Sequence, residues 1–199
     1  MSISMDQPSR ANSYVRSAVL EHVKKFWSNS VVFEEQWEEG PIQGNLPGFQ
    51  ILRVVSRIPG RPTIYVTNGC FVVEPAQHIR HEFFLVSPRE ELQHIETLTM
   101  LANFHADKRY RLDVGSVVNI GDPWIPGSKC DHLLISIPYP YGPKLEWLKM
   151  PGICVRFLWA LPITQREAAF VELNGLEALE QKFDAAKVDY MNPFRSSII

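Results

Sequence analysis

Apolar residues recur along this chain with two different periods, one typical of helices and one typical of strands. Between about residues 14 and 28 they follow helical spacing, which predicts an amphipathic first helix. Runs rich in β-branched and aromatic residues at 31–37, 49–58, 63–67, 70–73 and 82–86 predict strands. The strongly apolar runs 133–137 and 154–161 are too short for helices, so we expect central strands buried on both faces, the second ended by Pro162.

Two local signals predict how these segments are joined. Asn68-Gly69 stands between the runs 63–67 and 70–73, and this pair suits a type I′ turn, so the sequence predicts a β-hairpin there. Ser87, Pro88 and Glu90 combine a capping residue, a first-turn proline and an acidic residue of the first turn. A helix is therefore expected to begin at Pro88 and to end near the polar segment 107–109.

The end of the chain carries a second capping signal. Thr164 and Glu167 form a capping box, and Gly175 divides the helical pattern that follows into two helices. Strands come first, and helices lie at both ends and in the middle without regular alternation, which indicates an α+β fold. We expect a flexible N-terminal tail over residues 1–12 and a single domain over residues 13–199.

Composition excludes several functional classes. The chain has 199 residues, with 20 basic and 22 acidic side chains and a net charge of -2, so a nucleic acid is not expected as a partner. The N-terminus lacks the apolar core of a signal peptide, and no stretch is long and apolar enough to span a membrane, which predicts a cytoplasmic protein. Three widely spaced cysteines, Cys70, Cys130 and Cys154, favour reduced structural thiols.

A search for catalytic or metal-binding motifs finds little. The chain has no glycine-rich phosphate loop ending in lysine, no Gly-x-Ser-x-Gly elbow and no paired-cysteine metal motif, so neither a cofactor nor a metal is expected. The enzyme alternative is a small metal-dependent hydrolase that uses His78, His81, Cys130 and His132, which requires these side chains to converge in one pocket. The acidic run at 34–39 is interpreted as a solvated strand end.

The segment 121–147 combines stiff turns with large aromatic side chains. Prolines and glycines interrupt it so often that no helix can run through it, and rigid aromatic residues on ordered loops bind partners at low entropic cost. This pattern is typical of a recognition surface. The predicted partner-binding residues are Trp124, Asp131, Tyr139, Tyr141, Glu146 and Trp147.

Four ordered blocks in the second half of the chain resemble a known family. These blocks are GDPWIPGS from Gly121, DHLLISIPYPYGP from Asp131, FLWALPIT from Phe157 and NGLEALE from Asn174. Together they are similar to the Suppressor of Fused-like domain in its bacterial form. The resemblance is clearest from about Asp113 onward.

The resemblance implies an α/β sandwich with a central mixed, largely antiparallel sheet flanked by helices. It also implies a non-enzymatic function, namely binding another protein. Bacterial relatives would act as immunity proteins against toxins, and animal relatives sequester a transcription factor. The strand at 133–137 and its exit at 138–141 would correspond to the peptide-contacting region. Because we expect no room for the second domain of the animal proteins, an immunity protein is the primary hypothesis and a sequestering regulator the alternative. The oligomeric state is not predicted.

Overall fold

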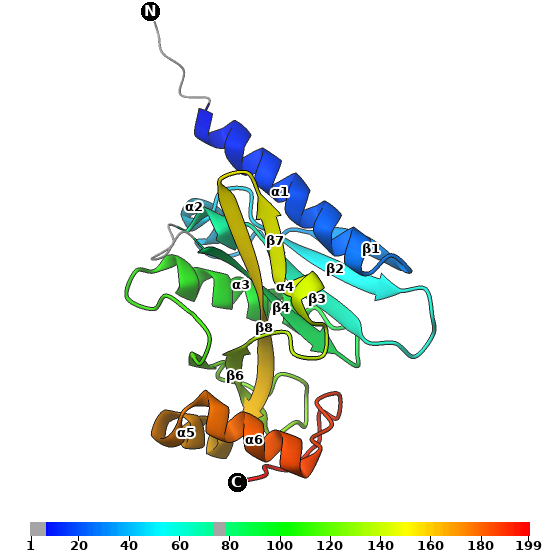
Figure 1. Ribbon diagram of the computed structural model, residues 1–199, viewed down its shortest axis with the longest axis vertical. Helices are drawn as coiled ribbons and strands as arrows, with labels where there is room; N and C mark the ends of the chain where they lie inside the picture. Colours follow the sequence, from blue (N-terminus) through cyan, green and yellow to red (C-terminus); the bar gives the residue numbers. More distant parts are fainter. Residues whose placement is uncertain (1–6, 74–78) are drawn as a thin grey trace, which may run out of the picture.

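One eight-stranded sheet organises the chain in the computed structural model, which describes residues 7–73 and 79–199. Figure 1 shows its elements in sequence colours. The strands are β1 (Ser30–Glu35), β2 (Gln50–Ser56), β3 (Thr63–Asn68), β4 (Ile79–Ser87), β5 (Val117–Asn119), β6 (Cys130–Ser136), β7 (Trp147–Met150) and β8 (Ile153–Thr164). The helices are α1 (Gln7–Phe26), α2 (Ile42–Asn45), α3 (Gln93–Ala106), α4 (Pro143–Glu146), α5 (Gln165–Asn174) and α6 (Leu176–Ala186), and a 3₁₀ turn η1 covers Cys70–Val72.

The strand order is β1-β2-β3-β4-β8-β6-β5, and β7 pairs with β8 beside this path. The first four strands form an antiparallel meander, and β4 and β8 are parallel. β8 has 12 residues and lies at the centre: β4 pairs along one edge, while β6 and β7 pair with different parts of the other. The predicted mixed, largely antiparallel sheet is therefore confirmed.

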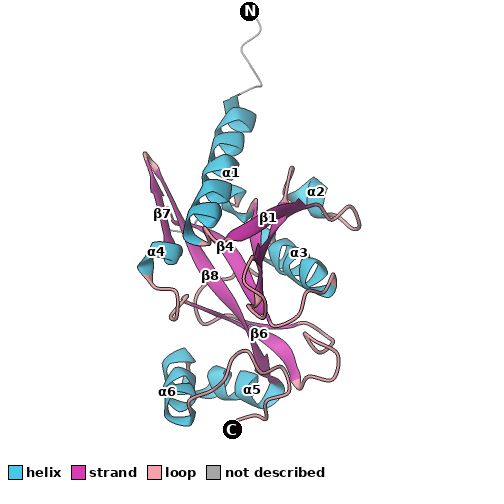
Figure 2. Cartoon of the chain, turned by 90° about the vertical axis from the view of Figure 1, so that its right-hand side faces the viewer, coloured by secondary structure: helices cyan, strands magenta, loops and turns pink. Residues whose placement is uncertain are grey.

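Helices cover both faces of the sheet, which makes two cores. Along β4, Phe84 and Val86 face the core beneath α1, whereas Phe83 and Leu85 face the core beneath α3. Figure 2 shows α1 and α3 on opposite sides of the strands, with α5 and α6 gathered at one end. Alternate residues of the central strands thus fill opposite cores, which explains their nearly continuous apolar sequence. The predicted sandwich with flanking helices is confirmed.

The predicted hairpin at Asn68-Gly69 is wrong. β3 pairs with β4 instead, and the chain after Gly69 turns into η1. Among the described residues Lys187 is the only non-glycine with a positive φ, so Asn68 does not adopt the conformation that a type I′ turn requires. Gly69 itself has a φ of 152°, and a Cβ there would lie 3.0 Å from the Cα of Phe49, so glycine is needed for another reason.

A buried carboxylate holds this turn in place. Glu82 on β4 is fully buried and accepts backbone N–H groups of Gly69 at 2.9 Å and Phe71 at 3.0 Å, together with the hydroxyl of Thr67. Burial raises the pKa of Glu82 to about 7, and these hydrogen bonds oppose the rise. The turn after β3 is thus determined by a residue on the neighbouring strand.

Three predicted element ends also differ from the structure. Residues 7–12, expected in a tail, belong to α1. α3 begins at Gln93 rather than Pro88, and the Ser87 hydroxyl accepts the N–H of Arg89 at 3.2 Å in a local turn instead of capping a helix. β8 runs past Pro162 to Thr164, since Pro162 needs no N–H there and its carbonyl accepts a hydrogen bond from Arg195.

The predicted capping box at the start of α5 is confirmed. Thr164 Oγ1 accepts the N–H of Glu167, and the Glu167 carboxylate accepts the N–H of Thr164 at 2.9 Å. The same carboxylate forms a buried ion pair with Arg195, with an Nη1–Oε1 distance of 2.6 Å. Burial alone would raise the pKa of Glu167, but Arg195 and the backbone donors hold it below its ordinary value. This ion pair holds the C-terminal segment around Arg195 against the end of β8.

Candidate functional site

Trp124, expected on the recognition surface, lies in the core. Only 1% of its surface is exposed, and its indole N–H donates to Ser128 Oγ at 3.0 Å. Its ring also lies beside the buried ring of His94, with centroids 5.8 Å apart. A tryptophan held in this way presents no surface to a partner, so the prediction for Trp124 has to be corrected.

The tyrosines of the proline-rich segment separate into an anchor and an exposed residue. Tyr141 is half-buried and packs edge-on against two aromatic rings. The distance between ring centroids is 5.6 Å to Phe84 and 6.2 Å to Trp159. Tyr139 is 73% exposed. The backbone closes a turn here, because the N–H groups of Tyr141 and Gly142 both donate to the carbonyl of Pro138 at 2.9 Å. We call residues 138–142 the Tyr139 loop: it is anchored by one aromatic ring and presents the other.

The remaining predicted residues lie towards opposite ends of β8. Glu146 receives a hydrogen bond from Arg156 at 2.8 Å, and the same guanidinium lies 4.9 Å from the ring centre of Trp147. Asp131 lies near the other end of β8 and pairs with His132 at 2.7 Å. The carboxylates of Asp131 and Glu146 therefore already have partners within the protein, and the two residues do not share a surface with each other.

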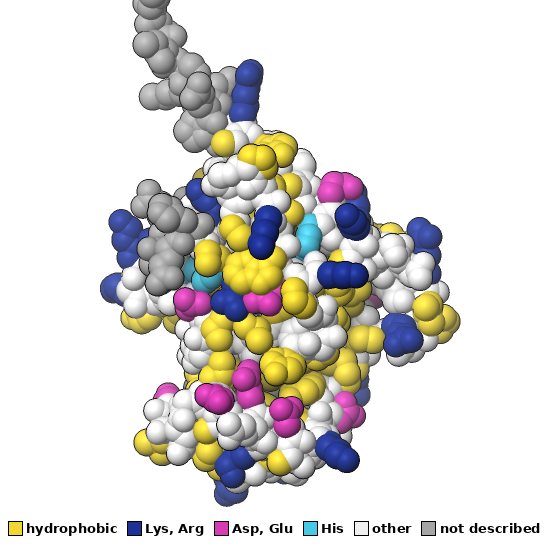
Figure 3. All heavy atoms as spheres, viewed as in Figure 1, with side chains coloured by type: hydrophobic (Ala, Val, Ile, Leu, Met, Phe, Trp, Pro, Cys, Tyr) yellow, Lys and Arg dark blue, Asp and Glu magenta, His cyan; other side chains and the backbone are white. Residues whose placement is uncertain are grey.

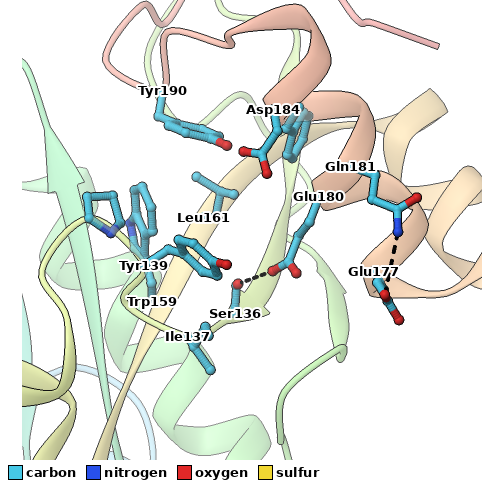
Figure 4. Close-up of a pocket in the computed structure, with 12 residues that line it drawn as sticks. Ser136, Ile137, Tyr139, Trp159, Leu161, Glu177, Glu180, Gln181, Asp184 and Tyr190 are labelled. Carbon is cyan, nitrogen blue, oxygen red and sulfur yellow. Dashed lines mark hydrogen bonds between the residues drawn. The ribbon is translucent and has the colours of Figure 1, made fainter.

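A cleft opens beside the Tyr139 loop, between the end of β6, the residues Trp159 and Leu161 of β8, and one face of α6. Its volume is about 360 Å³. Figure 4 shows the carboxylates of Glu180 and Asp184 and the hydroxyls of Tyr139 and Tyr190 directed toward the same space. We call this the α6 cleft, and it is lined by Ser136, Ile137, Tyr139, Pro140, Trp159, Leu161, Glu177, Glu180, Gln181, Phe183, Asp184 and Tyr190.

The α6 cleft is apolar at its base and acidic at its rim. Its rim carries Glu177, Glu180 and Asp184, and none of the described residues that line it is a lysine or arginine. Figure 3 shows acidic side chains gathered over α6 next to apolar surface. Ser136 donates to Glu180 at 2.9 Å and fixes that carboxylate. Burial is the main cause that raises the pKa of Tyr190; the charges of Asp184 and Glu180 raise it further, whereas the charge of Arg195 lowers it.

The sequence interpretation missed the acidic residues of the cleft, although a signal for them exists. Glu177, Glu180 and Asp184 follow the spacing i, i+3 and i+7, which places them on one face of a helix. The sequence could show that this face is acidic. It could not show that the face lies opposite Tyr139, because that placement depends on how α6 packs against β8.

The residues of the enzyme alternative do not converge. His81 lies opposite Arg156 on β8 and His132 lies opposite Ile163, seven residues further, which is about 23 Å along a strand. Cys130 is buried, and burial raises the pKa of its thiol, which disfavours the reactive thiolate. His78 lies outside the described residues. Within 7–73 and 79–199, no group of three or more His, Cys, Asp or Glu side chains is placed to hold a metal.

These features define the class of protein: it is an α+β domain with an open mixed sheet, helices on both faces and a surface cleft. Among the helices that the structure describes, none is long and apolar enough to cross a membrane. The sequence profile of the family Suppressor of fused protein (SUFU) matches residues 47–196. The chain belongs to the Suppressor of fused family.

Solved structures agree with this assignment. A protein from Neisseria gonorrhoeae FA 1090, assigned as a Suppressor of fused homologue, is 40% identical, with a TM-score of 0.82 over 94% of this chain and 98% of that chain. The Sufu–Fu complex structure is 13% identical, with a TM-score of 0.66 and 92% coverage of both chains. Drosophila Suppressor of Fused is 12% identical with a TM-score of 0.66, and 92% of this chain matches 51% of that chain. These last two show the shared fold alone. A search of curated protein sequences gave no significant match.

Proposed function

We propose that this protein is a cytoplasmic, non-enzymatic binding protein that neutralises a toxin by direct contact, in other words an immunity protein. Membership of the Suppressor of fused family supports a binding role, since one structure with this fold is of a Sufu–Fu complex. The 40% identity to the Neisseria protein favours the bacterial form, for which the resemblance implies toxin immunity.

The observation that carries the proposal is the Tyr139 loop. A large aromatic ring that is 73% exposed on a closed, proline-bounded turn can bury its surface in a partner without ordering new backbone. Aromatic residues of this kind are frequent hot spots of protein interfaces. Asp131 lies towards one end of β8 and Glu146 and Trp147 towards the other, so they would add two separate contact regions beyond the Tyr139 loop. These contacts are a further part of the proposal.

The alternative proposed function is a regulator that sequesters another protein. The shared fold with Sufu in the Sufu–Fu complex supports it, and it would use the same surface. The identity of the bound protein separates the two functions.

The experiment is a pull-down from the native cell with wild-type, Tyr139→Ala and Tyr14→Ala proteins. Tyr14 is a matched control, since it is 62% exposed and lies on α1, away from the Tyr139 loop. We expect Tyr139→Ala to weaken partner affinity about 30-fold, which corresponds to ~2 kcal/mol, and Tyr14→Ala to leave it unchanged. Tyr141 is left intact because its ring packs against buried aromatic residues.

The captured protein is then expressed in cells with and without this protein. Growth arrest that wild-type protein relieves and Tyr139→Ala relieves poorly supports immunity. A partner that is not toxic, or toxicity that persists when the wild-type protein is bound, contradicts immunity. A non-toxic transcription factor among the captured proteins would instead support the regulator.

A further inference from the structure

β1 is the longest strand whose outer edge no described strand pairs. β5 and β7, which also border the sheet, have three and four residues, whereas β1 has six. Figure 1 shows β1 at the outer border of the sheet. Val31 and Phe33 lie on one face of this strand and are 39% and 42% exposed. A long border strand with exposed apolar side chains is a template for pairing with another strand.

The backbone pairing shows which groups of β1 point away from β2. The N–H of Arg57 donates to the carbonyl of Asn29 at 3.0 Å, which continues the antiparallel register of β1 and β2. Bonded and non-bonded pairs alternate in such a ladder, so every second residue of β1 bonds to β2. The N–H of Ser30 agrees with this alternation, because it donates to the carbonyl of Trp27 at 3.0 Å and not to β2. The residues whose backbone groups point outward are Ser30, Val32 and Glu34.

We propose that two copies of this protein form a symmetric dimer in which their β1 strands pair antiparallel at the outer edges. The register that joins most outward groups places Val32 of one copy opposite Val32 of the other. These two residues then exchange both backbone hydrogen bonds, and each Glu34 N–H donates to the carbonyl of Ser30 in the second copy. This inference goes beyond the proposed function.

The same register covers the exposed apolar side chains. It places Val31 opposite Phe33 of the second copy, and residues that are directly opposite have Cβ atoms about 4.5–5.5 Å apart. An aromatic ring beside a β-branched residue is a favourable cross-strand pair. The guanidinium of Arg53 lies 4.4 Å from the ring centre of Phe33 and is held by Glu35 at 2.6 Å. Because the ring is already packed on one side, little side-chain ordering accompanies dimerisation.

The charges near β1 favour a second copy of this chain as the occupant of the edge. Glu34, Glu38 and Glu39 lie at or just beyond the C-terminal end of β1, and Arg57 and Arg61 lie in the turn after β2, beside its N-terminal end. Among the described residues, none of these five side chains forms an ion pair. Antiparallel pairing brings the acidic end of each copy next to the basic end of the other. Both edges are used in this contact, so the assembly closes as a dimer.

The first test is sedimentation equilibrium of the full chain at concentrations up to about 1 mM. We expect a reversible dimer whose dissociation constant rises with salt concentration. Val32→Pro removes an outward N–H without removing a bond between β1 and β2, and it should weaken the dimer at least about tenfold. A wild-type protein that stays monomeric, or a folded Val32→Pro protein that dimerises as wild type, would overturn the inference.

A charge exchange provides a second test that leaves the strand backbone intact. Glu34→Lys with Glu38→Lys makes both ends of β1 basic, and Arg57→Glu with Arg61→Glu makes both ends acidic. Each double variant alone should be monomeric, because like charges then meet at both ends of the paired strands. An equimolar mixture of the two variants should form a heterodimer. If the mixture stays monomeric, the inference is wrong.

A control pair tests whether the change of net charge alone matters. Glu172→Lys with Glu177→Lys makes the same change as the basic variant at exposed sites on α5 and α6. Figure 2 shows these helices gathered at one end of the molecule, away from β1. The control should dimerise as wild type, and equal weakening by the control would count against the proposed edge.

Hydrogen exchange identifies the surface that is used. The N–H groups of Val32 and Glu34 should exchange more slowly as protein concentration rises, whereas that of Phe33 is bonded within the sheet and should not respond. A dimer without this protection uses another surface and contradicts the inference. The pull-down with Tyr139→Ala reports on the binding of a different protein, so its failure and the absence of a dimer are separate outcomes.

Discussion

Replacing the buried Glu82 by glutamine should stabilise the protein, and the gain should appear only as pH rises. Glu82 is fully buried, and burial raises its pKa from 4.5 to about 7. The unfolded chain releases this proton near pH 4.5, whereas the folded chain holds it to about pH 7. The contribution of protonated Glu82 to stability is therefore fully present below about pH 4.5 and is lost progressively as pH rises through about pH 7.

The size of the effect follows from the shift. The pKa of Glu82 is raised by about 2.5, and each pKa unit corresponds to 1.36 kcal/mol. The ionisation of Glu82 therefore lowers the free energy of unfolding by ~3 kcal/mol at pH 8 and above. Glutamine removes this loss and can keep the local hydrogen bonds: its Oε1 accepts from Gly69 and Phe71, and its Nε2 donates to Thr67 Oγ1. The hydroxyl proton of Thr67 can then turn to the carbonyl of Phe83, which lies 3.3 Å away.

The assay is urea unfolding of wild-type and Glu82→Gln proteins at a series of values from about pH 4 to pH 9, followed by tryptophan fluorescence. The difference between their free energies of unfolding should rise by ~1.4 kcal/mol per pH unit between about pH 4.5 and pH 7 and then stay constant. Glu172→Gln, at an exposed position of α5, should show a flat difference. A flat difference for Glu82→Gln as well would refute the reasoning.

Two further predictions concern other buried charged or polar groups. Arg195→Met leaves Glu167 buried without its cation and should lower the free energy of unfolding by about 3–5 kcal/mol, as measured by guanidinium unfolding. Adding Glu167→Gln should recover part of the loss, and a single variant as stable as wild type would contradict this. His94 is buried and has no hydrogen-bond partner among the described residues, and burial lowers its pKa to about 4. The folded protein therefore loses stability as pH falls from about 6.5 to 4. His94→Phe should therefore move the acid-unfolding midpoint to lower pH, and an unchanged midpoint would count against the argument.

Local patterns in the sequence were sufficient where neighbouring residues decide the structure. The capping box of Thr164 and Glu167 is complete within four residues, and it forms as predicted. The apolar runs of β6 and β8 are buried on both faces, so their composition alone indicates central strands. The fold class followed from such signals.

The predictions were wrong where a residue that is distant in the sequence determines the local structure. Asn68-Gly69 suits a tight hairpin, but Glu82 captures the N–H groups beyond it and bends the chain into η1. Trp124 lies in a segment rich in turns, yet its ring is buried against His94 of α3. For the candidate site, the exposure of Tyr139 agreed with the proline-rich pattern, whereas the α6 cleft depends on packing between segments that a linear pattern does not relate.

The parallel pairing of β4 with β8 has a consequence for synthesis on the ribosome. The meander β1–β4 emerges first, but the inner edge of β4 remains unpaired until the residues of β8 have been translated. An open edge of apolar strand is a template for association with other chains, and pairing across such a long sequence separation is slow. The nascent chain thus passes through an aggregation-prone stage, and chaperones that shield β4 should increase the yield of folded protein.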